Sequence, residues 1–293
     1  MSILVTGASG KFGTISINLL LEKGVEKNKI IALGRDESKL EQFKEKGIQT
    51  RKADYNNYEE LLSAFKGVEK LLFVSSNEVE IRTKQHQDVV KAAKEAGVKY
   101  IAYTSMIRKT GDGSSPVAFV ETAHIETEKF IKESGIPYAI LKNALYTDTL
   151  TEYFFGPDTL TNGIFFPLEQ GSSNYATRRD LAEATINVIL SSDQHQNKEY
   201  TLTGRDSPTL NDAIKVLSEI AGKELPYVSP DIDTYKKTVA GFGTPTHYIN
   251  FLVAFALAIK AGEFSTDQSD LPKLLGKEQQ SLENYLIEFY KKN

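Results

Sequence analysis

The sequence contains no cysteine, and this absence excludes several kinds of chemistry. A chain without thiols cannot form disulfides, use a thiolate nucleophile, or build a cysteine-ligated zinc or iron–sulfur centre. A strong basic excess is also missing, because 35 Lys and Arg residues stand against 39 Asp and Glu residues, a net charge of −4. Nucleic-acid-binding domains usually carry a basic face. We therefore expect no nucleic-acid partner and no metal site.

Long apolar runs are lacking as well. The longest uninterrupted one is Phe251 to Ile259, whereas a membrane-spanning helix needs about 20 apolar residues. Met1 leads directly into an apolar strand pattern, without the basic segment and apolar stretch of a signal peptide. We expect a cytoplasmic protein with no membrane insertion. The sequence leaves open whether it works alone or as a homodimer.

The first thirteen residues carry the strongest pattern. The apolar run Ile3–Val5 leads into three glycines spaced three residues apart, and a helical pattern follows at once. Such a turn directs free backbone N–H groups and the positive end of a helix dipole at one point, which favours a phosphate. The first glycine permits the tight turn, the second admits a diphosphate, and the third lets helix and strand pack. An ordinary strand–helix turn is the alternative. The context predicts a dinucleotide site formed by Gly7, Ala8, Ser9, Gly10, Lys11, Phe12 and Gly13.

Strand and helix patterns alternate through the first half of the chain. Alternation at this spacing predicts a parallel sheet with helices on both faces, an α/β fold of the Rossmann-type, doubly wound kind. Glycines follow five of the helical runs, as expected of helix ends. The expected strands are 3–5, 29–33, 48–52, 70–74, 100–104 and 138–141, and the expected helices are 11–23, 37–46, 58–65, 79–96 and 118–134.

The regular order weakens after about residue 150. We expect a helix at 179–190, a strand at 199–202, a helix at 210–221, and mostly helix from 231 onward. The predicted domains are an NADP-binding Rossmann domain at 1–155, to which 178–204 return, and a smaller lobe at 156–177 and 205–293. This lobe, mostly helical, should cover the carboxyl edge of the sheet, where ligands bind in such folds.

Arg35 indicates which nicotinamide dinucleotide is bound. NAD-specific folds usually place an acidic residue at the end of the second strand to bind the ribose 2′-hydroxyl. Here Arg35 stands at that point, and a guanidinium suits a 2′-phosphate. Asp36 follows it and could still reach a ribose, although capping the next helix is its simpler role. The pattern favours NADP(H).

Polar residues follow the third, fourth and fifth strands. Because the carboxyl ends of parallel strands share one edge of the sheet, we expect these side chains to line the cofactor site. The residues are Asp54, Tyr55, Ser75, Ser76, Asn77, Thr104 and Ser105. For Asp54 and Tyr55 a solvated loop pair is an equally good interpretation.

The helix after the fifth strand lacks a tyrosine. Short-chain reductases carry Tyr-x-x-x-Lys there, and the tyrosine protonates the forming alkoxide. This chain has Lys129 at the lysine position but Ile125 at the tyrosine position. We expect Lys129 to contact the nicotinamide ribose. His124 is the nearest candidate acid, with a packed helix histidine as its alternative.

The missing acid favours one type of acceptor. Reducing a simple ketone gives an alkoxide, whose conjugate acid is about as weak as water, with a pKa near 15.7. Such a product needs a positioned acid. Reducing a quinone gives a phenolate, whose acid has a pKa closer to about 10, and water can supply that proton. The residues therefore suit hydride transfer to a quinone.

At these positions the chain resembles the type 2 NAD(P)H:quinone oxidoreductases of the NmrA-like, atypical short-chain dehydrogenase group. The resemblance covers nearly the whole chain, includes Thr6–Gly10, and is most specific at 96–105 and at His124–Lys129. It implies NADPH as donor, a small quinone as acceptor and no flavin. It also implies that Asn143 and Tyr146 line the nicotinamide and acceptor pocket. Two other functions stay open, a non-catalytic NADP(H)-binding redox sensor and a sugar-nucleotide epimerase.

Overall fold

The computed structural model describes residues 1–292 and is built around one seven-stranded, fully parallel sheet. The strand order is β3-β2-β1-β4-β5-β6-β8. The first five strands in the chain are short, apolar and buried, except for the polar edge strand β3. The bounds are β1 Ile3–Val5, β2 Ile30–Gly34, β3 Gln49–Lys52, β4 Lys70–Phe73, β5 Tyr100–Met106, β6 Tyr138–Asn143 and β8 Lys198–Leu202.

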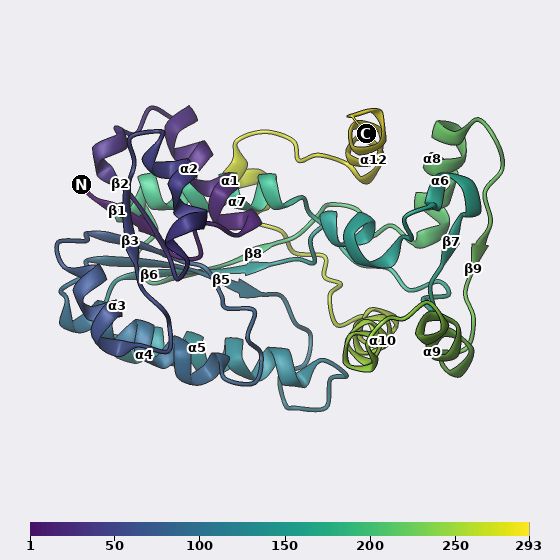
Figure 1. Cartoon of the computed structure of the whole chain (residues 1–293), viewed down its shortest axis with the longest axis horizontal. Coiled ribbons are helices and arrows are strands. Elements are labelled where there is room, and N and C mark those ends of the chain that lie inside the picture. Colours follow the sequence, from purple (N-terminus) through teal and green to yellow (C-terminus); the bar gives the residue numbers. More distant parts are fainter. Residues whose placement is uncertain (293) are drawn as a thin grey trace.

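Helices cover both faces of this sheet (Figure 1). One face carries α1 (Lys11–Glu22), α2 (Glu41–Lys44) and α7 (Arg178–Leu190). The other carries α3 (Tyr58–Phe65), α4 (Arg82–Glu95) and α5 (Ala118–Ser134). Each layer has its own apolar core against the sheet. The predicted Rossmann-type fold is confirmed, and short 3₁₀ turns connect its parts at Lys27–Lys29 (η1), Glu37–Leu40 (η2) and Ser192–Gln194 (η4).

The sheet brings the predicted site residues to one edge. The chain crosses from one face to the other between β1 and β4, which are neighbours in the sheet although β2 and β3 lie between them in sequence. Ligands of open α/β sheets bind outside the carboxyl ends of the strands at such a switch point. The glycine turn after β1 and the loops after β4, β5 and β6 all lie there.

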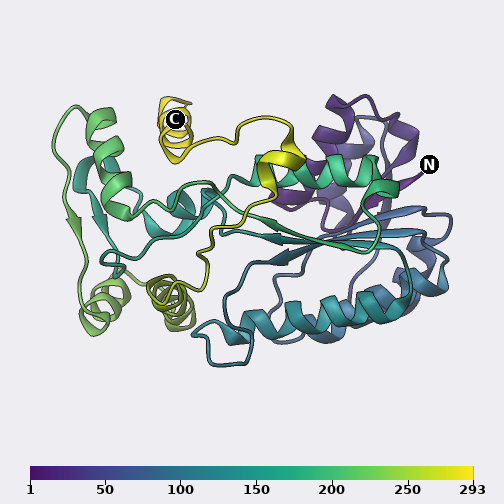
Figure 2. The same ribbon diagram turned by 180° about the vertical axis from the view of Figure 1, so that it is seen from behind.

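A second lobe extends from this edge, and its elements enclose a separate apolar core (Figure 2). It contains a two-stranded parallel sheet of β7 and β9, which the sequence analysis did not expect. The elements are a π-helical turn η3 (Leu150–Phe154), α6 (Thr159–Asn162), β7 (Ile164–Phe165), α8 (Leu210–Ala221), β9 (Tyr227–Val228), α9 (Ile232–Gly241), α10 (Thr246–Lys260) and α12 (Leu282–Lys292).

Two expected boundaries are wrong. The sequence predicts that 1–155 form the first domain, but η3 contributes Leu150 and Phe154 to the core of the second lobe. The sequence also predicts that 205–293 belong to the second lobe, but α11 (Leu271–Leu275) returns to the sheet and packs on α7. Its Leu271, Leu274 and Leu275 are buried in the core of the first domain, and Asn187 of α7 donates a hydrogen bond to the Leu274 carbonyl at 2.8 Å. Within residues 1–292, every helix is too short or too polar to cross a lipid bilayer.

Candidate functional site

The glycine turn after β1 has the geometry that a diphosphate needs. Gly7 adopts φ +57°, and the Gly10 amide donates to its carbonyl at 2.9 Å. A Cβ at Gly13 would lie 2.3 Å from the Gly7 oxygen, so only glycine allows α1 to start this close to the turn. Gly10 caps α1 without a side chain, and the first turn of α1 holds no acidic residue. The positive end of the helix dipole is therefore left for an external anion.

Arg35 lies at the end of β2, where the adenosine is expected, and forms an ion pair with Glu78 from the loop after β4. Glu78 also accepts a hydrogen bond from Gln85 at 2.7 Å. Asp36 makes local contacts instead. Its carboxylate accepts hydrogen bonds from the Ser38 amide at 3.0 Å and from the Ser38 hydroxyl at 2.6 Å. The helix-cap interpretation of Asp36 is thus confirmed, and the Arg35 guanidinium, 66% exposed, is held by Glu78.

Asp54 and Tyr55 are held by local contacts. Asp54 accepts a hydrogen bond from the Asn56 amide at 2.8 Å, which closes a tight turn. The Tyr55 hydroxyl donates to the Val74 carbonyl at 3.0 Å, and its ring meets Phe73 edge-on. Tyr55 therefore braces the loop after β4.

Hydrogen bonds to β5 and α4 fix the loop that contains Ser75, Ser76 and Asn77. The Ser75 amide donates to the Thr104 hydroxyl at 2.9 Å, and the Ser76 amide donates to Nε2 of His86 at 3.0 Å. Thr104 is buried, whereas Asn77 is exposed. These contacts give Thr104 a positioning role for the loop at the carboxyl edge of the sheet.

His124 belongs to a buried cluster under β4 and β5. Its Nδ1 lies 2.8 Å from the Tyr103 hydroxyl, while Nδ1 of His86 lies 2.7 Å from the Thr127 hydroxyl. Burial lowers the pKa of His86 to about 3 and holds the pKa of His124 well below its usual range. Both rings are neutral at physiological pH. The structure thus places His124 as a packed histidine and gives it no charge to use as an acid.

The structure does not bring Lys129 to this edge. Lys129 is exposed on the outer side of α5, while its neighbour Glu128 is buried. Glu128 accepts from the Ser105 hydroxyl at 2.5 Å and forms two hydrogen bonds with Arg108, at 2.9 and 2.7 Å. The buried face of α5 presents His124 and Glu128, one helical turn apart. The expected contact of Lys129 depends on the adjacent Ile125–Lys129 register, and the Glu128–Arg108 pair joins residues 20 positions apart.

Asn143 ends β6 with a carboxamide that makes no well-aligned hydrogen bond with any residue of 1–292. The residue is 3% exposed, and both Oδ1 and Nδ2 are buried without a bond of acceptable geometry. Nearby, Tyr146 stacks on Phe12 of the glycine turn at 6.2 Å, and the Arg178 guanidinium lies 4.9 Å from its ring centre. Burial raises the pKa of Tyr146, against the opposing influence of Asn143 and Arg178. Buried amides normally have partners, so Asn143 is suited to receive the carboxamide of a nicotinamide.

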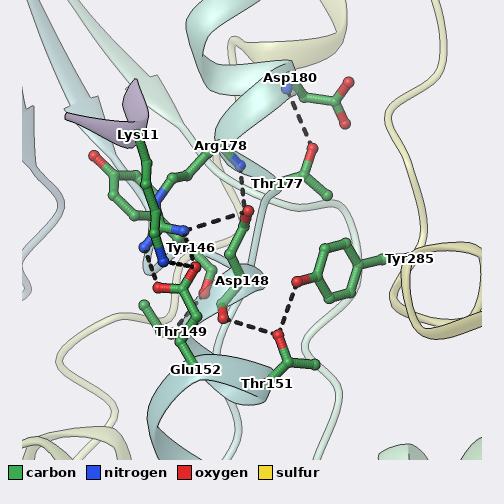
Figure 3. Close-up of polar contacts among 10 residues, drawn as sticks. All are labelled: Lys11, Tyr146, Asp148, Thr149, Thr151, Glu152, Thr177, Arg178, Asp180 and Tyr285. Carbon is green, nitrogen blue, oxygen red and sulfur yellow. Dashed lines mark hydrogen bonds and ion pairs between the residues drawn. The ribbon is translucent and has the colours of Figure 1, made fainter. Parts of the chain in front are cut away.

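Charged residues connect the glycine turn to the second lobe (Figure 3). Glu152 of η3 accepts from Arg178 at 2.5 and 2.8 Å and pairs with Lys11 at 2.8 Å. Burial opposes ionisation of Glu152, but Arg178 and Lys11 outweigh it and hold its pKa below the usual range. Asp148 caps the start of α7 by accepting from the Arg178 amide at 2.9 Å. An open hollow of about 350 Å³ lies here, and its lining includes Ser9 and Lys11.

Most of the predicted residues thus fall into two groups. Those of the glycine turn, Arg35, the loop after β4, Asn143 and Tyr146 share the carboxyl edge, whereas Tyr55, Thr104, Ser105 and His124 support it from inside. Asp54, which closes a local turn, and Lys129, which is exposed on α5, belong to neither group. Glu78, Glu128, Arg108, Glu152 and Arg178 were missed, because each acts through a contact with residues distant in sequence.

Comparisons with known proteins agree with this geometry. The model of the NmrA-like family matches residues 1–286. Quinone oxidoreductase 2 of Escherichia coli is 36% identical over 275 residues, which are 94% of this chain and 93% of that protein. The structure of triphenylmethane reductase from Citrobacter sp. superposes with a TM-score of 0.90 at 34% identity, covering 99% of this chain and all of that one.

A second solved structure has a TM-score of 0.89 at 34% identity and covers 98% of this chain and 99% of its own. It is the NADPH-dependent quinone oxidoreductase of Escherichia coli, in complex with NADPH. The resemblance seen in the sequence is therefore confirmed over nearly the full length, and the chain belongs to the NmrA-like family.

Proposed function

We propose that this protein is an NADPH-dependent oxidoreductase that transfers a hydride to a small quinone without a flavin. The observation that carries the proposal is the buried, unpartnered carboxamide of Asn143 at the same sheet edge as the glycine turn. This arrangement fits a dinucleotide whose diphosphate lies on the turn and whose nicotinamide reaches β6. The similarity to enzymes that use NADPH supports the same cofactor here.

The residues divide the binding of NADPH among themselves. The amides at the start of α1 would hold the diphosphate, and Arg35 would hold the 2′-phosphate once it leaves Glu78. Asn143 would hold the carboxamide, with Tyr146 packed beside it. When bound, the reduced nicotinamide supplies a hydride, that is, two electrons and one proton.

The edge offers no strong acid, which favours a quinone. Ile125 occupies the tyrosine position, His124 is neutral and buried, and burial raises the pKa of Tyr146. A quinone's reduced oxygen needs little help, because the corresponding phenol has a pKa of about 10. Two similar proteins are named for conjugated acceptors, a quinone and a triphenylmethane dye, and we propose a conjugated acceptor here.

The test is flavin-free NADPH oxidation followed by absorbance, with benzoquinone as acceptor and a simple ketone as control. We expect turnover with the quinone and none with the ketone. Tight NADPH binding without turnover on a panel of quinones would instead favour the redox sensor. Dependence on a nucleotide-linked sugar would favour the epimerase.

Compartment and assembly belong to the same proposal. We propose a cytoplasmic enzyme, since the reductant that it uses is a cytoplasmic metabolite and the chain has no cysteine that would gain from oxidation. A homodimer is the arrangement to test by sedimentation, and a mass of 32.6 kDa in solution would contradict it.

A further inference from the structure

Arg82, the first residue of α4, is a buried cation without an anion. It is 6% exposed, and its Nε is buried with no hydrogen-bond partner. No ion pair or hydrogen bond joins its guanidinium to any residue within 1–292. An uncompensated buried charge costs several kcal/mol, and an unsatisfied buried group in a native structure calls for an explanation.

The position of Arg82 relates it to the carboxyl edge. A helix that follows a parallel strand begins at this edge, and α4 follows β4 by way of the Ser75–Asn77 loop. One turn further along α4, Nε2 of His86 accepts a hydrogen bond from the Ser76 amide at 3.0 Å. Arg82 is thus nearer the edge than a residue already in contact with the loop.

The surroundings of Arg82 provide no counter-charge. The groups whose pKa it perturbs are His86, His124 and Tyr103, all of them uncharged. Glu128, a buried carboxylate of α5, is committed to Arg108 and Ser105. Within residues 1–292, the structure therefore shows no carboxylate bonded to the Arg82 guanidinium.

We infer that Arg82 binds one oxygen of the electron acceptor, namely the oxygen that becomes negatively charged during reduction. The charge of Arg82 would stabilise this oxygen, whereas the tyrosine of short-chain reductases protonates it. The inference rests on the proposed function and adds a catalytic residue to it. Arginine keeps its proton throughout, so it stabilises an anion and is not an acid. Fixed donors aimed at a developing oxyanion are among the largest contributions to catalysis.

The reaction balances without any further reagent. The quinone gains a hydride, the nicotinamide is oxidised by two electrons, and the quinone's other oxygen becomes a phenolate. Arg82 holds this phenolate until water protonates it, which gives the neutral quinol. The same site would accept any flat acceptor whose reduced form carries negative charge on oxygen or nitrogen.

The test compares Arg82→Met with Arg178→Met, because Arg178 is equally buried, at 7% exposed, but is paired with Glu152. If Arg82 serves the acceptor, Arg82→Met should raise the Tm by a few degrees, since it removes an unpaired charge. Arg178→Met should lower the Tm because it leaves Glu152 short of a partner. With benzoquinone, Arg82→Met should lower kcat/KM about 100-fold and leave the Kd for NADPH within about twofold.

Two further measurements do not depend on the Met variant. Guanidinium chloride should restore part of the activity of Arg82→Ala, whereas sodium chloride should not. With NADP⁺ present, 4-nitrophenolate should bind the natural protein more tightly than Arg82→Gln, and nitrobenzene should not distinguish them. Equal phenolate binding, an NADPH affinity that falls together with the rate, or a lowered Tm in Arg82→Met would each overturn the inference. A natural protein that binds phenolate through Arg82 but does not oxidise NADPH would contradict only the proposed function.

Discussion

The guanidinium of Arg35, at the end of β2, is paired with the carboxylate of Glu78 in the loop after β4. The two residues are 43 positions apart in sequence, and the Arg35 side chain is 66% exposed. Gln85 holds the other carboxylate oxygen of Glu78 at 2.7 Å. The group expected to recognise a 2′-phosphate is therefore engaged by a protein anion, which a phosphate must displace.

Removing this competing anion should tighten NADPH binding. Exposed ion pairs are worth about 0.2–1 kcal/mol, so we expect Glu78→Gln to lower the Kd for NADPH by a factor of about 1.4 to 5. NADH lacks the 2′-phosphate, and its Kd should stay unchanged. Glu80→Gln, two residues away and exposed, is the matched control. Titration by NADPH fluorescence measures all three proteins, and equal tightening for both cofactors would contradict the competition.

Arg35→Asp should reverse the cofactor preference. A hydrogen bond to a charged group contributes about 1.5–3 kcal/mol, or on the order of tenfold to a hundredfold in affinity. The aspartate would repel the 2′-phosphate and could accept from a ribose hydroxyl, as acidic residues do in NAD-specific folds. The measurement is a pair of binding titrations. If Arg35→Asp weakened the binding of NADPH and NADH equally, Arg35 would not recognise the 2′-phosphate.

Gly13→Ala should damage both the fold and the cofactor site. The added Cβ would stand 2.3 Å from the Gly7 oxygen and 2.9 Å from the Ala8 Cα, and both are backbone atoms that cannot turn aside. Overpacking costs about 1–3 kcal/mol or more, and here it would also push α1 away from the turn. Gly156→Ala is the control, because nothing lies within 4 Å of its Cβ position. Urea unfolding and NADPH titration should both separate the two variants.

The sheet could be predicted because its signals are local. Buried strands such as β1 read as apolar runs, and helices such as α3 and α5 show the expected period and a glycine after their ends. The β7–β9 sheet has two-residue strands that exist only through pairing of Ile164 with Tyr227 and Phe165 with Val228. The return of α11 likewise depends on an α7 surface more than 80 residues earlier.

The same division separates the predicted from the missed site residues. The glycine turn is specified within thirteen consecutive residues, so the sequence alone indicates it. The orientation of α5 about its axis cannot be predicted in this way, because a shift of one residue exchanges buried Glu128 for exposed Lys129. The absence of a partner for Arg82 or Asn143 is a property of the folded neighbourhood, and no sequence pattern encodes it.

His86 should make stability depend on pH. Its folded-state pKa of about 3 lies below the ordinary value of 6.5, so the unfolded state binds more protons between these values. The contribution of His86 is complete above the unfolded pKa and is lost as the pH falls toward 3. The limiting slope is about 1.4 kcal/mol per pH unit.

Urea unfolding between about pH 4 and 6.5 tests this dependence. The quantity to compare is the slope of the unfolding free energy against pH, and not the unfolding free energy itself. In His86→Gln, the unfolding free energy should change with pH less steeply, by about 1.4 kcal/mol per pH unit, since glutamine does not titrate. His124 shifts in the same direction, so part of the dependence should remain. Exposed His247 supplies the control variant, His247→Gln. Parallel pH curves for the natural protein and His86→Gln would refute the assignment.

Asn143→Leu should stabilise the protein while weakening its function. The substitution removes two buried polar atoms that make no well-aligned hydrogen bond within residues 1–292, and each unsatisfied atom of this kind costs about 1–3 kcal/mol. Asn174 is a matched control: it is 5% exposed, its amide donates to Gly204 at 3.2 Å, and it accepts from the Thr266 amide at 2.9 Å. Asn174→Leu should therefore lower the Tm, because it leaves backbone groups unpaired. Asn143→Leu should raise the Tm by a few degrees yet weaken NADPH binding. A purely structural Asn143 would instead lower the Tm and leave the Kd unchanged.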